Sequence, residues 1–232
     1  MLHNTRELYG YKLAASDGAI GHVKDFYFDD STWVIRYLVA DTGSWLSGRL
    51  VLLSPHAFGP VDPAEKTLHV KLRQKQIENS PSPETHQPVS RHYEIEYFRY
   101  YGWPVYWEGS STWGLGGFPV VVPPATAELD ATPRRVHHRA DQHLQSAKAV
   151  TGYALHASDG EIGSVSGFRV DPKSWAIRDV VVETGHWFAG KEILIAPHDV
   201  ERISYEDSMV FVNVTKAAIQ RTAENHPVKK NA

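Results

Sequence analysis

The chain has 232 residues, of which 42% are hydrophobic and 22% charged, and its formal net charge is -3. This composition is that of a soluble globular protein with room for one large or two small domains. The lack of cysteine excludes disulfides and thiolate chemistry. No apolar run reaches the roughly 20 residues that span a bilayer, so we expect a cytoplasmic protein without a membrane span.

Residues 1–79 predict a first domain made of short strands. The Ser-Asp-Gly turn at Asp17 and Gly18 predicts a hairpin, because glycine tolerates the positive φ of a tight turn. Gly21 interrupts the alternation of the following strand, which indicates a bulge. Further strands are expected at 33–40, 50–53 and 68–72, and one helical turn at 74–79.

Residues 80–151 differ in composition and predict a linker insert rich in proline and aromatic residues. They hold eight of the chain's 14 prolines, and 93–118 holds ten of its 26 Phe, Trp and Tyr residues. Tyr93, Tyr97 and Tyr101 recur every fourth residue, which predicts a short helix that ends at Gly102.

The aromatic side chains of the insert have two principal interpretations. They either pack on the strands and complete a core, or stay exposed as an interface, because Trp and Tyr are enriched at interface centres. The candidate interface residues are Tyr93, Tyr97, Tyr101, Trp103, Tyr106, Trp107, Trp113 and Phe118. A third possibility, a base-stacking platform, would need neighbouring Lys and Arg residues, which are few.

The densest histidine cluster lies at the end of the insert, at His137, His138, Asp141 and His143. It has neither HExxH nor a comparable ligand spacing, so solvated residues on a short helix are the simpler interpretation. We expect no metal and no cofactor.

A second domain, 152–232, repeats the first. At an offset of 142, residues 10–56 align with 152–198 without a gap, and 23 of the 47 positions are identical. Residues 10–79 carry eight basic and eight acidic side chains, and 152–221 carry seven and ten. Neither copy has the basic excess that holds a phosphate backbone, which argues against nucleic acid as a partner.

Residues that recur in both copies are predicted to maintain the fold. Short carboxylates at turns bond to their own backbone, and a Pro-His pair at the same place in both copies indicates a turn. The recurring set is Asp17, Gly18, Gly21, Trp33, Arg36 and His56, with Asp159, Gly160, Gly163, Trp175, Arg178 and His198. Neither GxSxG nor GxGxxG occurs and no nucleophile-base pair is indicated, so no catalytic residue is expected.

The order of DGxIG, Trp, Arg and SPH or APH in each copy resembles the PRC-barrel domain, in a tandem arrangement of two. The family also includes the cytoplasmic part of the photosynthetic reaction-centre H subunit and the C-terminal half of a ribosome maturation factor. The resemblance implies small six-stranded barrels that act as adaptors.

The expected fold is therefore mainly β, with two six-stranded antiparallel barrels joined by a partly helical, aromatic-rich insert. The leading hypothesis is a non-enzymatic scaffold or protein-protein interaction module, with a protein partner or self-association. The alternatives are an RNA- or ribosome-associated adaptor, and a ligand-binding protein or enzyme that uses a pocket between the barrels.

Overall fold

The computed structural model describes residues 2–82, 89–114, 116–119, 144–185 and 190–225. The chain forms two compact units, which we name after the repeat that each contains. The repeat-1 unit holds Tyr9–Leu144 and Lys173–Trp175. The repeat-2 unit holds Met1–Leu8, Gln145–Pro172 and Ala176–Ala232.

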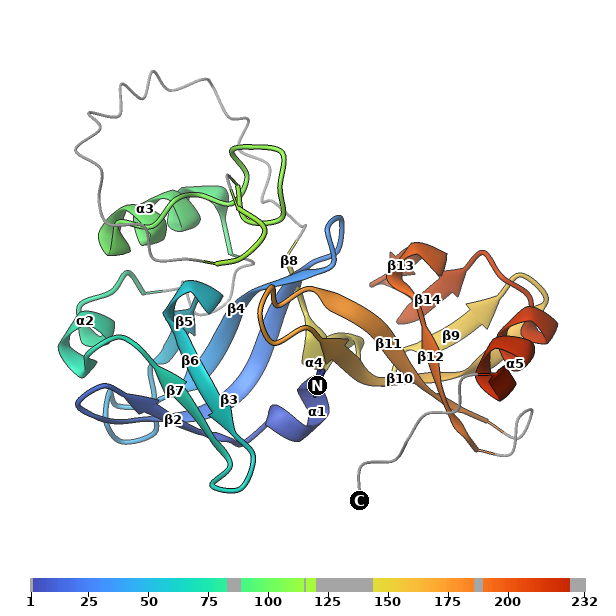
Figure 1. The fold of residues 1–232 in the computed structure, drawn as a ribbon, viewed down its shortest axis with the longest axis horizontal. Helices are drawn as coiled ribbons and strands as arrows, with labels where there is room; N and C mark the ends of the chain where they lie inside the picture. Colours follow the sequence, from blue (N-terminus) through green and yellow to red (C-terminus); the bar gives the residue numbers. More distant parts are fainter. Residues whose placement is uncertain (1, 83–88, 115, 120–143, 186–189, 226–232) are drawn as a thin grey trace. The chain divides into compact units, whose positions relative to one another are not determined.

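The repeat-1 unit contains a sheet with the strand order β5-β4-β3-β2-β7-β6. The strands are β2 (Lys12–Ala15), β3 (Gly18–Asp29), β4 (Val34–Asp41), β5 (Leu50–Leu53), β6 (Phe58–Asp62) and β7 (Thr67–Val70). A 3-10 helix, η1 (Pro55–Ala57), follows β5, and the helices are α2 (Gln74–Glu78) and α3 (Arg91–Tyr101) (Figure 1).

The sheet of the repeat-2 unit has the equivalent order, β12-β11-β10-β9-β14-β13. Its strands are β9 (Ala154–Ala157), β10 (Gly160–Val170), β11 (Ile177–Thr184), β12 (Glu192–Ile195), β13 (Val200–Ser204) and β14 (Met209–Val212). The remaining elements are β1 (His3–Asn4), which pairs with β10, α1 (Thr5–Leu8), β8 (Leu144–Ser146), α4 (Ala147–Val150), η3 (Pro197–Asp199) and α5 (Lys216–Asn225). None of the helices described is long and apolar enough to cross a membrane.

The expected mainly-β fold, with two six-stranded repeats and a partly helical aromatic insert, is confirmed, and two details differ. The sheets are mixed, because β2 pairs with β7, and β9 with β14, in parallel. The intervening strands give the chain the long crossover that parallel pairing needs. Among the described residues, no ladder joins β5 to β6 or β12 to β13, so the paired strands do not close into a barrel.

Strand β6 has no counterpart in the sequence prediction, which placed a loop there. Its sequence, FGPVD, contains glycine and proline, both of which weaken a strand signal. Proline is tolerated because β6 is the last strand of the sheet and its outer edge needs no N–H donor.

The two repeats build their turns in the same way. The Oδ1 atom of Asp17 accepts a hydrogen bond from the backbone N–H of Gln74, at the start of α2, at 2.8 Å. The Oδ1 atom of Asp159 accepts the equivalent bond from Lys216, at the start of α5, at 2.9 Å. These carboxylates therefore tie the first hairpin of each repeat to its last helix, rather than bonding only within their own turns.

A close approach between backbones explains one pair of recurring glycines. A Cβ atom at Gly21 would overlap the carbonyl oxygen of Asp41, and one at Gly163 would overlap that of Glu183. Gly21 also has a φ of 125°, in the region that favours glycine. The bulge predicted at Gly21 is present as a register shift between β2 and β3.

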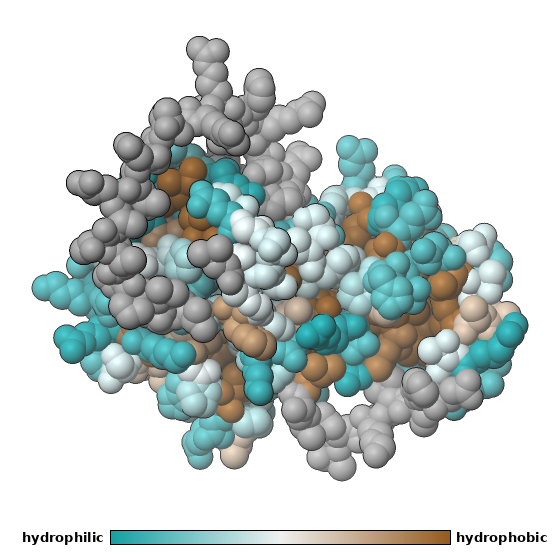
Figure 2. Space-filling model, turned by 45° about the horizontal axis from the view of Figure 1, so that its top comes forward, coloured by the Kyte–Doolittle hydropathy of each residue, from teal (hydrophilic) through white to brown (hydrophobic). Residues whose placement is uncertain are grey.

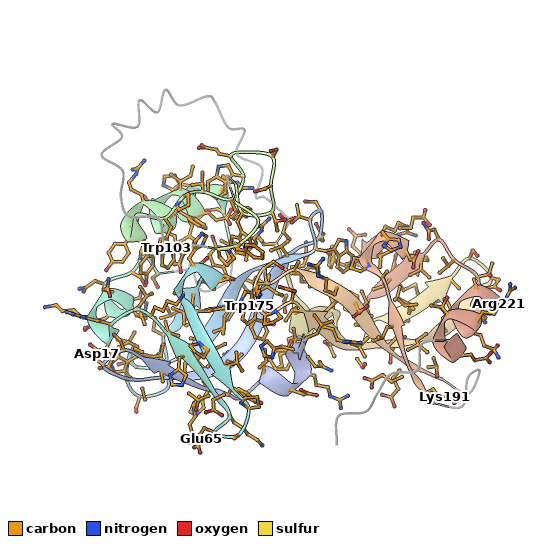
Figure 3. The ribbon with its side chains drawn as sticks, in the orientation of Figure 1. Asp17, Glu65, Trp103, Trp175, Lys191 and Arg221 are labelled. Atoms are coloured by element: carbon orange, nitrogen blue, oxygen red, sulfur yellow. The ribbon has the colours of Figure 1, made fainter. Side chains whose placement is uncertain are left out.

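Trp33 and Trp175 occupy the same turn position but differ in burial. Both adopt positive φ, 55° and 56°, so Trp33 belongs to the turn before β4 rather than to the strand predicted there. Trp33 is half-buried, whereas Trp175 is 3% exposed. The Trp175 ring lies 4.6 Å from that of Phe58 and 6.1 Å from that of Phe26, and its carbonyl accepts a hydrogen bond from Ile35 (Figure 3).

We expect Trp175→Ala to destabilise the repeat-1 unit by about 3 kcal/mol, because it removes a large buried ring from between Phe26 and Phe58. Trp33→Ala is the matched control, since the backbone strain is the same and the ring is less buried. Urea unfolding measures the total cost, and hydrogen exchange at the Phe26 and Phe58 amides locates it. Equal costs for both variants would contradict the assignment of Trp175 to this core.

Candidate functional site

The aromatic insert covers one face of the repeat-1 sheet. Every residue from Val34 to Ala40 in β4 is buried, although a strand with one solvated face would alternate. In β11, the equivalent strand of the other repeat, Arg178 and Glu183 are exposed. The difference arises because α3 and the chain after it pack on β4 and β5, which Figure 1 shows below α3.

Helix α3 is capped at both ends, and it ends at Gly102 as its sequence predicts. The Oγ atom of Ser90 accepts a hydrogen bond from the Tyr93 N–H at the first turn. Gly102 ends the helix with a φ of 67°, a left-handed conformation typical of a helix C-terminus. The reversal at Gly102 leads directly to the buried side chain of Trp103.

A fully buried carboxylate, Glu94, joins α3 to the sheet. Its Oε1 atom accepts hydrogen bonds from the hydroxyls of Tyr37, at 2.9 Å, and Tyr106, at 2.7 Å. Its Oε2 atom pairs with Arg91 at 2.9 Å. Burial, together with the charge of Glu94, raises the pKa of both tyrosines, so both phenols stay protonated as donors.

Arg36 is buried on the same face and is held largely by the insert. Its guanidinium donates to the carbonyl of Thr112 at 2.6 Å and lies 3.8 Å from the centre of the Tyr106 ring. It also pairs with Asp29 at 3.4 Å. Because Arg178 at the equivalent position is exposed, the buried arginine belongs to the contact with the insert and not to the repeat as such.

His56 is enclosed by aromatic rings. It stacks on Trp103 at 5.3 Å between ring centres and meets Trp113 edge-on at 5.0 Å. Its Nδ1 atom lies 3.0 Å from the Oγ of Ser54. Burial, and then the charge of Arg36, lowers the pKa of His56 to about 4, so the ring is neutral at physiological pH.

Next to His56 the surface is hollowed into a cavity of about 420 Å³, which we call the aromatic recess. Its lining residues are His56, Ala57, Lys71, Leu72, Gln76, Tyr100, Tyr101 and Trp103. The rings of Tyr101 and Trp103 stack at 4.4 Å and 12°, and Trp103 is seen where α3 meets the strands in Figure 3. Tyr100 is 42% exposed and donates a hydrogen bond to the carbonyl of Gln76.

The candidate interface residues divide by burial. Tyr97, Trp103, Tyr106 and Trp113 are buried against the repeat-1 sheet, Tyr93, Tyr101 and Trp107 are half-buried, and Phe118 is 53% exposed. Trp103 and Tyr101 line the recess. Trp113 donates its indole N–H to the carbonyl of Ser174 at 2.8 Å.

Five recess residues were not singled out in the sequence analysis: Ala57, Lys71, Leu72, Gln76 and Tyr100. Tyr100 lies outside the i, i+4 pattern that singled out its neighbours. Lys71 and Gln76 could have been found by asking where the repeats differ, because the offset of 142 places Asn213 and Ala218 at their positions.

The recurring residues do not share the same surroundings in the two repeats. Arg36 is buried but Arg178 is exposed, and His56 is buried but the side chain of His198 is 84% exposed. Among the described residues there is no group of three His, Cys, Asp or Glu side chains that could hold a metal ion. The cluster of His137, His138, Asp141 and His143 lies outside the described residues.

We expect Glu94→Gln to lower the free energy of unfolding by about 2 kcal/mol, because it replaces a buried, charge-assisted acceptor by a neutral one and leaves Arg91 without its partner charge. Glu96→Gln is the matched control, since Glu96 is exposed on the same helix. Urea unfolding of both variants measures the difference. A similar, small effect for both would show that Glu94 does not bind the insert to the sheet.

The free energy of unfolding of the repeat-1 unit should decrease as the pH is lowered, because His56 becomes protonated. Its pKa is lowered to about 4 in the folded protein from 6.5, so folding favours the neutral ring. Neutral His56 contributes about 3 kcal/mol to the free energy of unfolding above pH 6.5, and this contribution is lost as the pH falls towards 4. His56→Gln should flatten this part of the stability profile, and His198→Gln should leave it unchanged. A loss of stability in that pH range that persists in His56→Gln would count against this origin.

Comparison with known proteins identifies the first repeat. The family model of the PRC-barrel domain matches residues 3–77. No curated protein matches the chain. The sheet β9–β14 repeats the strand order and turn chemistry of the matched segment at the constant offset. The chain therefore contains a PRC-barrel domain at residues 3–77 and a second, similar sheet in its C-terminal half.

Proposed function

We propose that the protein is a non-enzymatic interaction module that binds a protein partner at the aromatic recess of its repeat-1 unit. The observation that carries this proposal is the exposure of Tyr100 at the rim of a recess whose other aromatic walls are fixed. Tyr100 and Phe118 are the exposed large hydrophobic side chains among the described residues, and both belong to the insert.

The ionisable groups beneath the recess support a structural rather than a catalytic role. Glu94 and Arg36 are enclosed and bonded to tyrosine hydroxyls, a backbone carbonyl and Asp29. His56 is neutral and packed between indole rings. A general base must reach the proton that it abstracts. Glu94 and Arg36 are enclosed, and His56, although it lines the recess, is only 1% exposed. PRC-barrel domains are in general non-catalytic, which supports the same proposal.

The recess suits recognition because its walls are already in place. Trp103 is held between His56 on one side and Tyr101 on the other. Side chains that are fixed before binding lose little conformational entropy on association, so more of the contact energy appears as affinity. Aromatic side chains in such positions often contribute most of the affinity of an interface.

The face seen in Figure 2 mixes hydrophobic and hydrophilic side chains instead of presenting one uniform apolar area. An extended hydrophobic patch would indicate a large permanent interface, whereas scattered apolar residues are ordinary for a protein surface. We propose that recognition is concentrated at the recess and its rim, where Tyr100 is exposed.

Tyr100→Ser should weaken the complex with the partner at least about tenfold, because it removes a half-exposed aromatic ring without disturbing the core. Arg99→Ser is the control, since Arg99 is exposed on the same helix. The partner is first captured with wild-type protein, then purified, and its affinity for each variant is measured by calorimetry. Sedimentation of the protein alone tests a second copy as the partner. A complex that Tyr100→Ser leaves intact, or no complex in either format, would overturn the proposal.

A further inference from the structure

We infer that the aromatic recess binds the C-terminal end of a partner polypeptide, with its terminal carboxylate near Lys71 and Gln76 and an aromatic or large apolar last side chain against Trp103 and Tyr101. This inference rests on the proposed function and specifies the chemistry of the partner.

The charge of the recess favours an anion. Among the described residues that line it, Lys71 is the one with a formal charge at neutral pH, because His56 is neutral there. Lys71 is exposed, and across the part of the chain that the structure describes no carboxylate forms an ion pair with it. An unpaired ammonium beside aromatic walls attracts a negatively charged group and disfavours a cation, which the walls alone would accept.

Gln76 adds a donor of known orientation. Its Oε1 atom accepts a hydrogen bond from the backbone N–H of Arg73 at 2.9 Å, which directs the amide NH₂ away from that contact. The carbonyl of Gln76 is itself occupied by the hydroxyl of Tyr100. The side chains of Lys71 and Gln76 therefore supply donors to the recess, and the two oxygens of a carboxylate can accept from both.

The size and walls of the recess limit what carries the carboxylate. A cavity of about 420 Å³ lies near the lower end of the range for ligand sites, so it holds about one residue and not a folded surface. The Tyr101 and Trp103 rings offer a flat apolar wall. An Asp or Glu side chain carries a carboxylate but offers little apolar surface to the aromatic wall. A C-terminal aromatic or large aliphatic residue has both in one unit.

The second repeat shows that the fold does not require these donors. At the offset of 142, Asn213 replaces Lys71 and Ala218 replaces Gln76, while an acidic residue, Asp199, replaces Ala57. The same strand order forms without either donor. Lys71 and Gln76 thus belong to the distinctive part of the repeat-1 unit, together with the insert that supplies the aromatic wall.

The experiment uses the full chain and follows its tryptophan indole N–H signals by NMR, with Trp103 assigned from Trp103→Phe. The probes are a pentapeptide that ends in phenylalanine with a free carboxylate, the same peptide amidated, the same peptide ending in serine, and phenylacetate. We expect saturable shifts of the Trp103 signal with the free-acid phenylalanine peptide, and at least tenfold weaker binding for the amidated and serine peptides. Lys71→Met should weaken the free-acid peptide about tenfold, whereas Lys75→Met, an exposed lysine on α2 outside the recess, should stay within twofold of wild type.

Equal binding of the acid and the amide, or an unchanged affinity in Lys71→Met, would overturn the carboxylate assignment. Tighter binding of phenylacetate than of the free-acid peptide would assign the recess to a small aromatic acid and overturn the chain-terminus assignment. Either result leaves the proposed function standing if the captured partner still depends on Tyr100. If the captured partner binds Tyr100→Ser as tightly as wild type while the peptide still binds, the protein-partner proposal is overturned instead. The failure of the proposed function can thus be distinguished from the failure of this inference.

Discussion

The contact between the aromatic insert and the outer face of β4 constrains the whole repeat-1 unit. It places an arginine, a glutamate and a histidine inside the protein, at Arg36, Glu94 and His56. Burying charged groups costs several kcal/mol each unless partners replace the lost water. Here the partners come from both sides of the contact, since the insert supplies the carbonyl of Thr112 and the sheet supplies the hydroxyl of Tyr37. Each side thus satisfies buried polar groups of the other, so the insert is an integral part of the unit.

The second repeat carries the same arginine and histidine in a different environment. Arg178 and His198 recur at the equivalent positions and are exposed. What differs is their surroundings: the insert packs on Arg36 and His56, and Tyr37, which donates to Glu94 of the insert, is replaced in the second repeat by Asp179, which pairs with Arg169 at 3.5 Å. A carboxylate there cannot donate to a second carboxylate as the tyrosine does to Glu94. The sequence identity of the two repeats therefore marks their shared turns, and the differences mark the face that only one of them covers.

The strand signals, the hairpin at Asp17 and a short helix through Tyr93 and Tyr101 that ends at Gly102 could be predicted because they depend on local chemistry: turn residues, alternation and i, i+4 spacing. The parallel pairing of β2 with β7 could not, since it depends on where a distant strand returns. Strand β6 was missed because its glycine and proline signal a loop, and only its edge position makes them acceptable. The assignment of Trp175 to the core around Phe58 likewise comes from long-range packing. Aromatic density located the candidate site, but burial decided which of its residues face outward.

The buried residues of the insert fix the positions of its exposed residues. Gly102 reverses the chain after α3, and this reversal brings Trp103 against His56 while Tyr101 stacks on its other side. The polar network around Glu94 fixes α3 on the sheet, and α3 in turn carries Tyr100 to the rim of the recess. Glu94, which is fully buried, thus helps to set where the walls of the recess stand without lining it. Because the recess is formed by one repeat and its insert together, substitutions in the insert can change its walls while the sheet stays the same.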